Sequence, residues 1–180
     1  MPLFLFSHRS TLGIIILNLP FSQRANGLIL VALCIGFASF VSASDFIGKV
    51  VGVTDGDTIT VLHIGTATKV RLAGIDCPEK AQPYGHKAKE ATSALVFGKE
   101  VIVQAHGQDK YGRAIGDVLL PHGKNINHTL VREGWCWWYR KYAPGDTTLE
   151  RLETDARAAK RGLWADPNPV PPWMWRHRSR

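Results

Sequence analysis

The chain has 180 residues, 45% of them apolar, and carries 22 lysines and arginines against 15 acidic residues. This length leaves room for one compact domain with an appendage and excludes several separate cores, and the apolar content is that of an ordinary globular protein. The formal charge of +7 suggests a polyanionic partner, but a mildly basic soluble surface gives the same excess. Charge alone therefore decides nothing about function.

The N-terminal region contains an uncharged apolar run that extends from Gly27 to Ser44, after Arg24 and before Asp45. A basic flank, an apolar run and small residues ahead of a cut are typical of a secretory signal, so we expect cleavage after Ala43. The run is also close to the shortest length that spans a membrane. Residues 1–43 are therefore interpreted as a signal peptide or an N-terminal membrane anchor, and the mature chain is expected to be secreted or periplasmic.

Three cysteines are present, and Cys34 lies inside the apolar run. Export would leave Cys77 and Cys136, which are too few for a disulfide framework. Their separation in space cannot be read from the sequence, so their pairing stays open. No CxxC or HExxH spacing occurs, and no zinc site is expected.

From residue 45 onward, short β-like runs alternate with helical ones. Branched and alternating residues predict five strands, two of them joined by a turn at Asp55-Gly56. Apolar spacing predicts three helices, the last introduced by a capping box from Thr147 to Glu150. The expected strands are 47–53, 58–61, 69–73, 99–104 and 113–120, and the expected helices are 85–97, 126–133 and 147–161. This pattern indicates an α+β fold built on a small five-stranded OB-type barrel with three helices.

The composition shifts after Trp164 to a segment rich in proline, tryptophan and arginine. Residues 44–166 are therefore interpreted as the domain and residues 167–180 as a tail. The tail shows no helical or strand period, and we expect an extended arm that packs back through its tryptophans.

Acidic and basic residues gather where strands end or turn. Asp57 and Asp76, with a backbone carbonyl and waters, offer the oxygen ligands that calcium prefers. Glu79 follows Pro78, in a position to hold or deprotonate a water near the metal. Arg71 and Arg113 supply planar guanidinium groups that bind phosphate oxygens in two-pronged fashion. These residue types together point to phosphate-ester chemistry.

Each of these signals has an ordinary structural explanation when taken singly. Asp55-Gly56 is a common hairpin turn, residues 76–79 can start a helix, and residues 109–113 can form an exposed turn with an ion pair. Only their joint occurrence argues for a site.

In this order and spacing the motifs resemble the staphylococcal nuclease (thermonuclease) family. They read DGDT from Asp55, an Arg-Leu strand at Arg71, GIDCPE from Gly74 and DKYGR from Asp109, and the similarity continues to the Gly-Leu-Trp at 162–164. The resemblance implies an OB-fold barrel with three helices that binds one calcium ion. It also implies hydrolysis of DNA and RNA phosphodiesters with 3′-phosphate products.

Carried over residue by residue, the resemblance also implies a role for each site residue. The metal ligands would be Asp57, Asp76 and the main-chain carbonyl of Cys77, which stands where the family has threonine, with Asp55 acting through water. The catalytic groups would be Glu79 as general base and the phosphate clamps Arg71 and Arg113. The substrate-binding groups would be Lys110, Tyr111 and, as the best candidate for base stacking, Tyr142.

The expected substrates are single-stranded DNA and RNA, because aromatic stacking grips every base and gives little sequence preference. We expect a monomer without an obligate protein partner. Two alternatives stay open: an OB-fold module that binds nucleic acid without cutting it, and a membrane-tethered protein whose basic tail lies on anionic lipid. The first is disfavoured because three acids and two arginines occupy all the matching positions.

Overall fold

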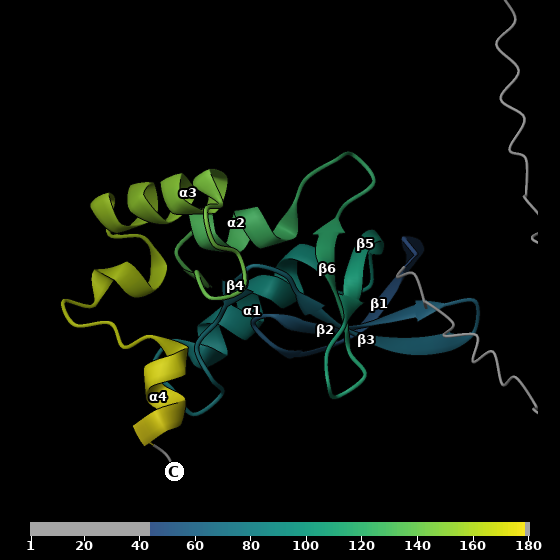
Figure 1. Ribbon diagram of the computed structural model, residues 1–180, viewed down its shortest axis with the longest axis horizontal. Coiled ribbons are helices and arrows are strands. Elements are labelled where there is room, and N and C mark those ends of the chain that lie inside the picture. The colour runs from purple at the N-terminus through teal and green to yellow at the C-terminus, as the bar shows by residue number, and fades with distance from the viewer. Residues whose placement is uncertain (1–43, 179–180) are drawn as a thin grey trace, which may run out of the picture. The chain divides into compact units, whose positions relative to one another are not determined.

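Five strands close into a barrel in the computed structural model, which describes residues 44–178 (Figure 1). The order around the barrel is β1-β2-β3-β6-β5, and β5 pairs back with β1. All neighbouring strands are antiparallel except β3 and β6, which run parallel. The strands are β1 (Phe46–Asp55), β2 (Thr58–His63), β3 (Thr66–Leu72), β5 (Glu100–Gln108) and β6 (Ala114–Leu119). The five-stranded barrel expected from the sequence is confirmed.

Four strands are longer than the sequence indicates, and the largest extensions are in β3 and β5. β3 starts at Thr66 because the ladder with β2 continues through Ala67 opposite Leu62 to the end of the hairpin. β5 runs on to Gln108 through residues that are mostly polar or exposed. Backbone hydrogen bonds hold these extensions, and alternation of apolar residues does not mark them.

The barrel interior is filled by β-branched side chains. They come from alternate positions of the strands, as expected where one face of a sheet is buried. Each such side chain contributes about 1.5–3 kcal/mol on burial. Fully buried members are Val50, Ile59, Val61, Val70, Val101, Val103 and Val118.

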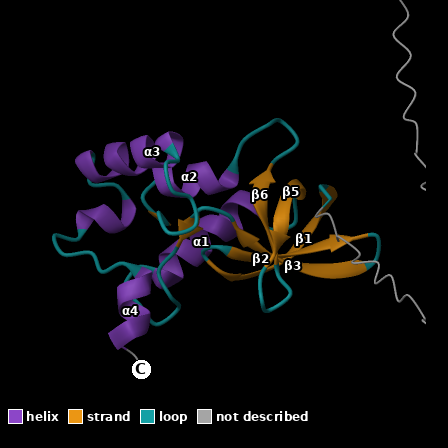
Figure 2. Ribbon diagram, viewed as in Figure 1, coloured by secondary structure: helices purple, strands orange, loops and turns teal. Residues whose placement is uncertain are grey.

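Three helices of the domain gather at one end of the barrel (Figure 2). They are α1 (Gly85–Val96), α2 (Ile126–Arg132) and α3 (Thr147–Ala158). The buried Thr92 of α1 donates its hydroxyl to the carbonyl of Gly56 at 2.6 Å, which ties the helix to the turn between β1 and β2. The predicted capping box of α3 is wrong by one residue, because Asp146 is the N-cap and accepts the N–H of Leu149 at 2.9 Å.

A second, two-stranded sheet lies beside the barrel and is not expected from the sequence. It pairs β4 (Ile75–Asp76) with β7 (Trp137–Trp138). A disulfide between Cys77 and Cys136 joins the same two segments. The sheet and the disulfide together hold the loop that follows Asp76 against the segment that contains Trp137 and Trp138.

The tail returns to the domain through its tryptophans, as expected. Trp173 stacks on Tyr139 with ring centroids 5.2 Å apart and meets Trp137 edge-on at 5.6 Å. A 3₁₀ helix η1 (Gly162–Ala165) ends the domain, and the expectation of a wholly extended arm after it is wrong, because residues of the tail form α4 (Pro172–Arg178). Proline is favoured at the first position of a helix, where its missing N–H costs nothing. We call residues 167–178 the C-terminal arm.

Within the described residues, no helix has the length and apolar character needed to cross a membrane. The signal or anchor expected at residues 1–43 lies outside the described part of the chain.

Candidate functional site

Two buried carboxylates meet one arginine at the end of the barrel where β1 turns into β2. Asp57 lies in that turn and Asp76 in β4, and they are 6% and 1% exposed. Arg71 of β3 forms an ion pair with Asp57, Nη1 lying 2.7 Å from Oδ2, and donates a hydrogen bond from Nη2 to Asp76 Oδ1 at 2.9 Å. Pairing of β2 with β3 explains the meeting, since Thr58 lies opposite Arg71. Two expected metal ligands and one expected phosphate arginine therefore share one site.

Asp57 is held by backbone groups as well as by Arg71. Its Oδ2 accepts the N–H of Cys77 at 2.7 Å, and its own N–H donates to Asp55 Oδ1 at 3.2 Å. Burial raises the pKa of Asp57 to about 7; Arg71 acts to lower it, while Asp55 and Asp76 raise it further. Arg71 therefore does not fully offset the cost of burying the Asp57 carboxylate as an anion.

The loop after β4 places Glu79 next to Asp76. Its backbone is fixed by Gln82, whose Oε1 accepts the Glu79 N–H at 3.1 Å and whose N–H donates to the Glu79 carbonyl at 2.8 Å. Gly85, at the start of α1, packs so closely on this carbonyl that an added Cβ would collide with it. The backbone of Glu79 is therefore tightly placed, whereas its side chain is 40% exposed.

The turn from Asp109 to Arg113 brings the second expected arginine to the site. Asp109 organises the turn by accepting the N–H groups of Tyr111 and Arg113 at 2.9 and 3.0 Å and the Arg113 Nε–H at 2.7 Å. Burial acts to raise the pKa of Asp109, but these hydrogen bonds outweigh it and hold the pKa below its ordinary value. Arg113 Nη1 also reaches the hydroxyl of Thr58 at 3.4 Å, directly beside Asp57.

The three expected substrate-binding residues lie on the surface. Tyr111 is 72% exposed and has the Lys110 ammonium 5.0 Å from its ring centroid. Tyr142 is 70% exposed and meets Tyr139 edge-on at 4.9 Å. Tyr139 also borders a cavity of about 340 Å³ lined by Arg140, Lys141, Trp173 and His177. Exposed aromatic rings next to cations suit a nucleobase and its phosphate.

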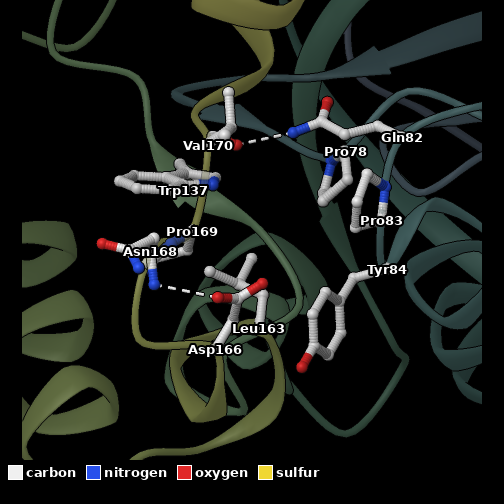
Figure 3. Close-up of a pocket in the computed structure, with 10 residues that line it drawn as sticks. All are labelled: Pro78, Gln82, Pro83, Tyr84, Trp137, Leu163, Asp166, Asn168, Pro169 and Val170. Atoms are coloured by element: carbon white, nitrogen blue, oxygen red, sulfur yellow. Dashed lines mark hydrogen bonds between the residues drawn. The ribbon is translucent and has the colours of Figure 1, made fainter.

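An arginine that the sequence analysis missed completes the cluster. Arg176 of α4 donates to Asp76 Oδ2 at 2.7 Å, to Asp76 Oδ1 at 3.2 Å and to Glu79 Oε1 at 2.7 Å. Gln82 was missed as well, and its Nε2 donates to the Val170 carbonyl of the C-terminal arm at 2.6 Å across a small cavity (Figure 3). The one available signal was Pro172 ahead of an aromatic and basic segment, which is typical of a helix start.

The donor set fits a hard divalent cation. Within residues 44–178, no three His, Cys, Asp or Glu side chains are arranged to hold a metal ion. Asp57 and Asp76 nevertheless share one guanidinium, and Asp57 Oδ1 accepts only the Thr58 hydroxyl, at 3.3 Å, among the described hydrogen bonds. Two buried carboxylates and the adjacent Cys77 main chain offer oxygen ligands of the kind that calcium binds, with water completing the coordination.

One end of the OB barrel thus carries buried carboxylates, arginines and a more exposed carboxylate. Hydrolysis of a phosphodiester uses groups of these kinds. A family model described as staphylococcal nuclease homologue matches residues 69–166. The chain belongs to the staphylococcal nuclease family and is a nuclease.

Similar curated proteins agree with this assignment. An uncharacterized endonuclease of Escherichia coli O157:H7 is 47% identical over 139 residues, which cover 77% of this chain and 90% of that protein. A micrococcal nuclease of Shigella flexneri is 42% identical over 146 residues, covering 76% of this chain and 84% of the other. An uncharacterized endonuclease of Haemophilus influenzae is 41% identical over 133 residues, covering 73% and 74%.

Proposed function

We propose that this chain is a calcium-dependent nuclease that hydrolyses DNA and RNA with low sequence specificity and leaves 3′-phosphate ends. The observation that carries the proposal is the shared contact of Asp57 and Asp76 with Arg71, beside Glu79 and within reach of Arg113. The endonuclease and micrococcal nuclease names of the relatives support it.

The carboxylates divide into two roles by their burial. Asp57 and Asp76 are almost fully buried and would hold calcium with the Cys77 carbonyl, whereas Glu79 is open to water. Bound calcium would supply positive charge beside the phosphoryl oxygens, where negative charge grows in the transition state. Glu79 would take a proton from the attacking water while the water oxygen bonds to phosphorus. The bond from phosphorus to the 5′ oxygen would break, and the leaving 5′ oxygen would take a proton from solvent.

The arginines retain free donors for the substrate. A guanidinium has five N–H groups, of which Arg71 uses Nη1 and Nη2 and Arg113 uses Nε and Nη1 in the contacts above. The remaining N–H groups would bind the scissile phosphate, and Lys110 with Tyr111 would bind a terminal phosphate. Stacking on Tyr142 would favour single-stranded substrates, since the faces of paired bases are covered by their neighbours.

We propose that the protein acts as a monomer.

Export is part of the same proposal. The apolar run that ends at Ala43 would direct translocation, and the Cys77–Cys136 disulfide supports an oxidising destination. N-terminal sequencing of the protein recovered from outside the cytoplasm should read from Ser44. An intact chain starting at Met1 in the membrane fraction would instead indicate an anchor.

Cleavage of heat-denatured DNA by the purified protein, with calcium and with a chelator, tests the activity directly. We expect degradation with calcium, none with chelator, and fragments that require phosphatase treatment before 3′ extension. Binding of single strands without cleavage in calcium would instead identify a non-catalytic OB module.

A further inference from the structure

The C-terminal arm reaches the candidate site through one side chain. Arg176 bridges the carboxylates of Asp76 and Glu79 with three hydrogen bonds of 2.7–3.2 Å. Its partners are 100 and 97 residues away in the chain. Asp76 is nearly inaccessible, with its side chain 2% exposed, so this contact is not an ordinary surface ion pair.

The arm is anchored independently of Arg176. Trp173 lies against Tyr139 and Trp137, and Pro172 is buried. Gln82 binds the Val170 carbonyl, as Figure 3 shows. The backbone from which Arg176 extends is therefore held in place by packing and by a separate hydrogen bond.

The same arm contacts both the backbone and the side chain of the Glu79 loop. Gln82 links the Glu79 backbone to Val170, and Arg176 links the Glu79 carboxylate to Asp76. Among residues 44–178, Arg176 is the one hydrogen-bond partner of the Glu79 carboxylate, which is otherwise open to solvent. A glutamate side chain with rotatable bonds and no partner samples several rotamers, and ordering it lowers the cost of reaching the reactive geometry.

We propose that Arg176 is a positioning residue that holds the Glu79 carboxylate beside the metal-binding carboxylate Asp76, so that the C-terminal arm is part of the active site. The inference rests on the proposed function, because it gives Glu79 the role of general base. Arg176 acts through Glu79 and is not itself required to touch the substrate.

Charge balance favours this role over that of an inhibitory plug. The site gathers four carboxylates: Asp57 and Asp76 contact Arg71, Asp55 accepts the Asp57 N–H, and Glu79 contacts Arg176. Arg113 is already paired with Asp109. Four negative charges exceed the combined charge of one arginine and one divalent cation, so Arg176 and calcium can be accommodated together. Asp76 Oδ2 accepts Arg176 alone among the described hydrogen bonds and keeps a lone pair for a metal.

Steady-state cleavage of single-stranded DNA in calcium tests the proposal with Arg176→Ala, Arg176→Lys and the control Arg178→Ala. Arg178 lies two residues further along α4 and is exposed, so its removal changes the arm's charge equally without touching Glu79. We expect Arg176→Ala to lower kcat by about 10–100-fold with little change in KM, as expected for a misplaced catalytic group. Arg176→Lys should regain part of kcat, because an ammonium keeps the charge but not the two-pronged geometry. Arg178→Ala should match the wild type.

A double-mutant cycle with Glu79→Gln separates positioning from a general structural effect. If Arg176 acts through Glu79, adding Arg176→Ala to Glu79→Gln should lower kcat by no more than about threefold further. If Arg176→Ala lowers kcat in the Glu79→Gln background as much as it does in the wild type, the inference is overturned. A rise in kcat for Arg176→Ala alone would also overturn it, because the arm would then be inhibitory.

Two measurements without turnover complete the test. Calorimetric calcium titration of Arg176→Ala should show affinity equal to or higher than that of the wild type, because a nearby positive charge is removed. Chymotrypsin should cut the arm at its tryptophans no faster in this variant. Weakened calcium binding or a released arm would overturn positioning of Glu79. An inactive wild type would refute the proposed function itself, whereas an active wild type with an equally active Arg176→Ala would refute this inference alone.

Discussion

Without calcium, the stability of the protein should fall as pH rises through the range in which Asp57 ionises. Burial raises the pKa of Asp57 from 3.8 to about 7 in the folded protein. The folded state therefore binds this proton more tightly than the unfolded state, and the associated stability is complete below pH 4 and lost as pH rises through 7. With these two values the loss between pH 5 and pH 8 is about 2–3 kcal/mol.

Replacing Asp57 with asparagine isolates this contribution from the other titrating groups. Urea unfolding in the presence of chelator, at pH 5, 6, 7 and 8, gives the free energy of unfolding of both proteins. The difference between Asp57→Asn and the wild type should shift in favour of the variant by about 2–3 kcal/mol over this range. Added calcium should restore the wild type at pH 8 and leave the variant largely unaffected. A difference that stays constant with pH would refute the account of Asp57 as an undercompensated buried charge.

The remaining predictions concern catalysis, the disulfide and substrate binding. Glu79→Gln should lower turnover by about 10²–10⁴-fold while calorimetry shows near-normal calcium affinity; lost calcium binding with normal turnover would contradict its assigned role. Replacing Cys77 and Cys136 with alanine should cost about 4 kcal/mol in urea unfolding, because the disulfide closes a loop with a sequence separation of 59, and an unchanged midpoint would argue against the bond. Binding of single-stranded DNA by Glu79→Gln should weaken with salt at a log–log slope of about −2, for about three phosphate contacts, and a flat response would count against nucleic acid as substrate.

The barrel and the two buried carboxylates were predictable because local signals encode them. Strand residues alternate around short turns, and Asp57 and Asp76 stand directly in or beside those turns. The turn at Asp109 is equally local, since one carboxylate organises the backbone up to Arg113. Elements of this kind are formed by neighbours in the chain, so their residue types reveal them.

What the sequence did not reveal depends on short elements and distant partners. β4 and β7 have two residues each, too few for a periodic pattern to stand out. α4 is as short as α2, but it follows a proline-rich stretch and lacks the buried apolar spacing that marks α2. The N-cap of α3 was misplaced because Asp146 and Thr147 are both good capping residues, and the tertiary structure selects the first. The contact of Arg176 with Glu79 joins residues 97 positions apart, and no local pattern encodes such a pair.

Contacts between distant residues show that the folded domain and its candidate site include more of the chain than the segment matched by the family model. That match covers residues 69–166, yet β1, β2 and Asp57 precede it and Arg176 follows it. Loss of β1 and β2 would open the barrel and expose the apolar side chains of β3 and β5. Loss of the arm would leave the barrel closed but remove the guanidinium that joins Asp76 to Glu79. The N-terminal strands are therefore needed to close the barrel and carry Asp57, the proposed metal ligand, whereas the arm bears on the placement of Glu79, the proposed general base.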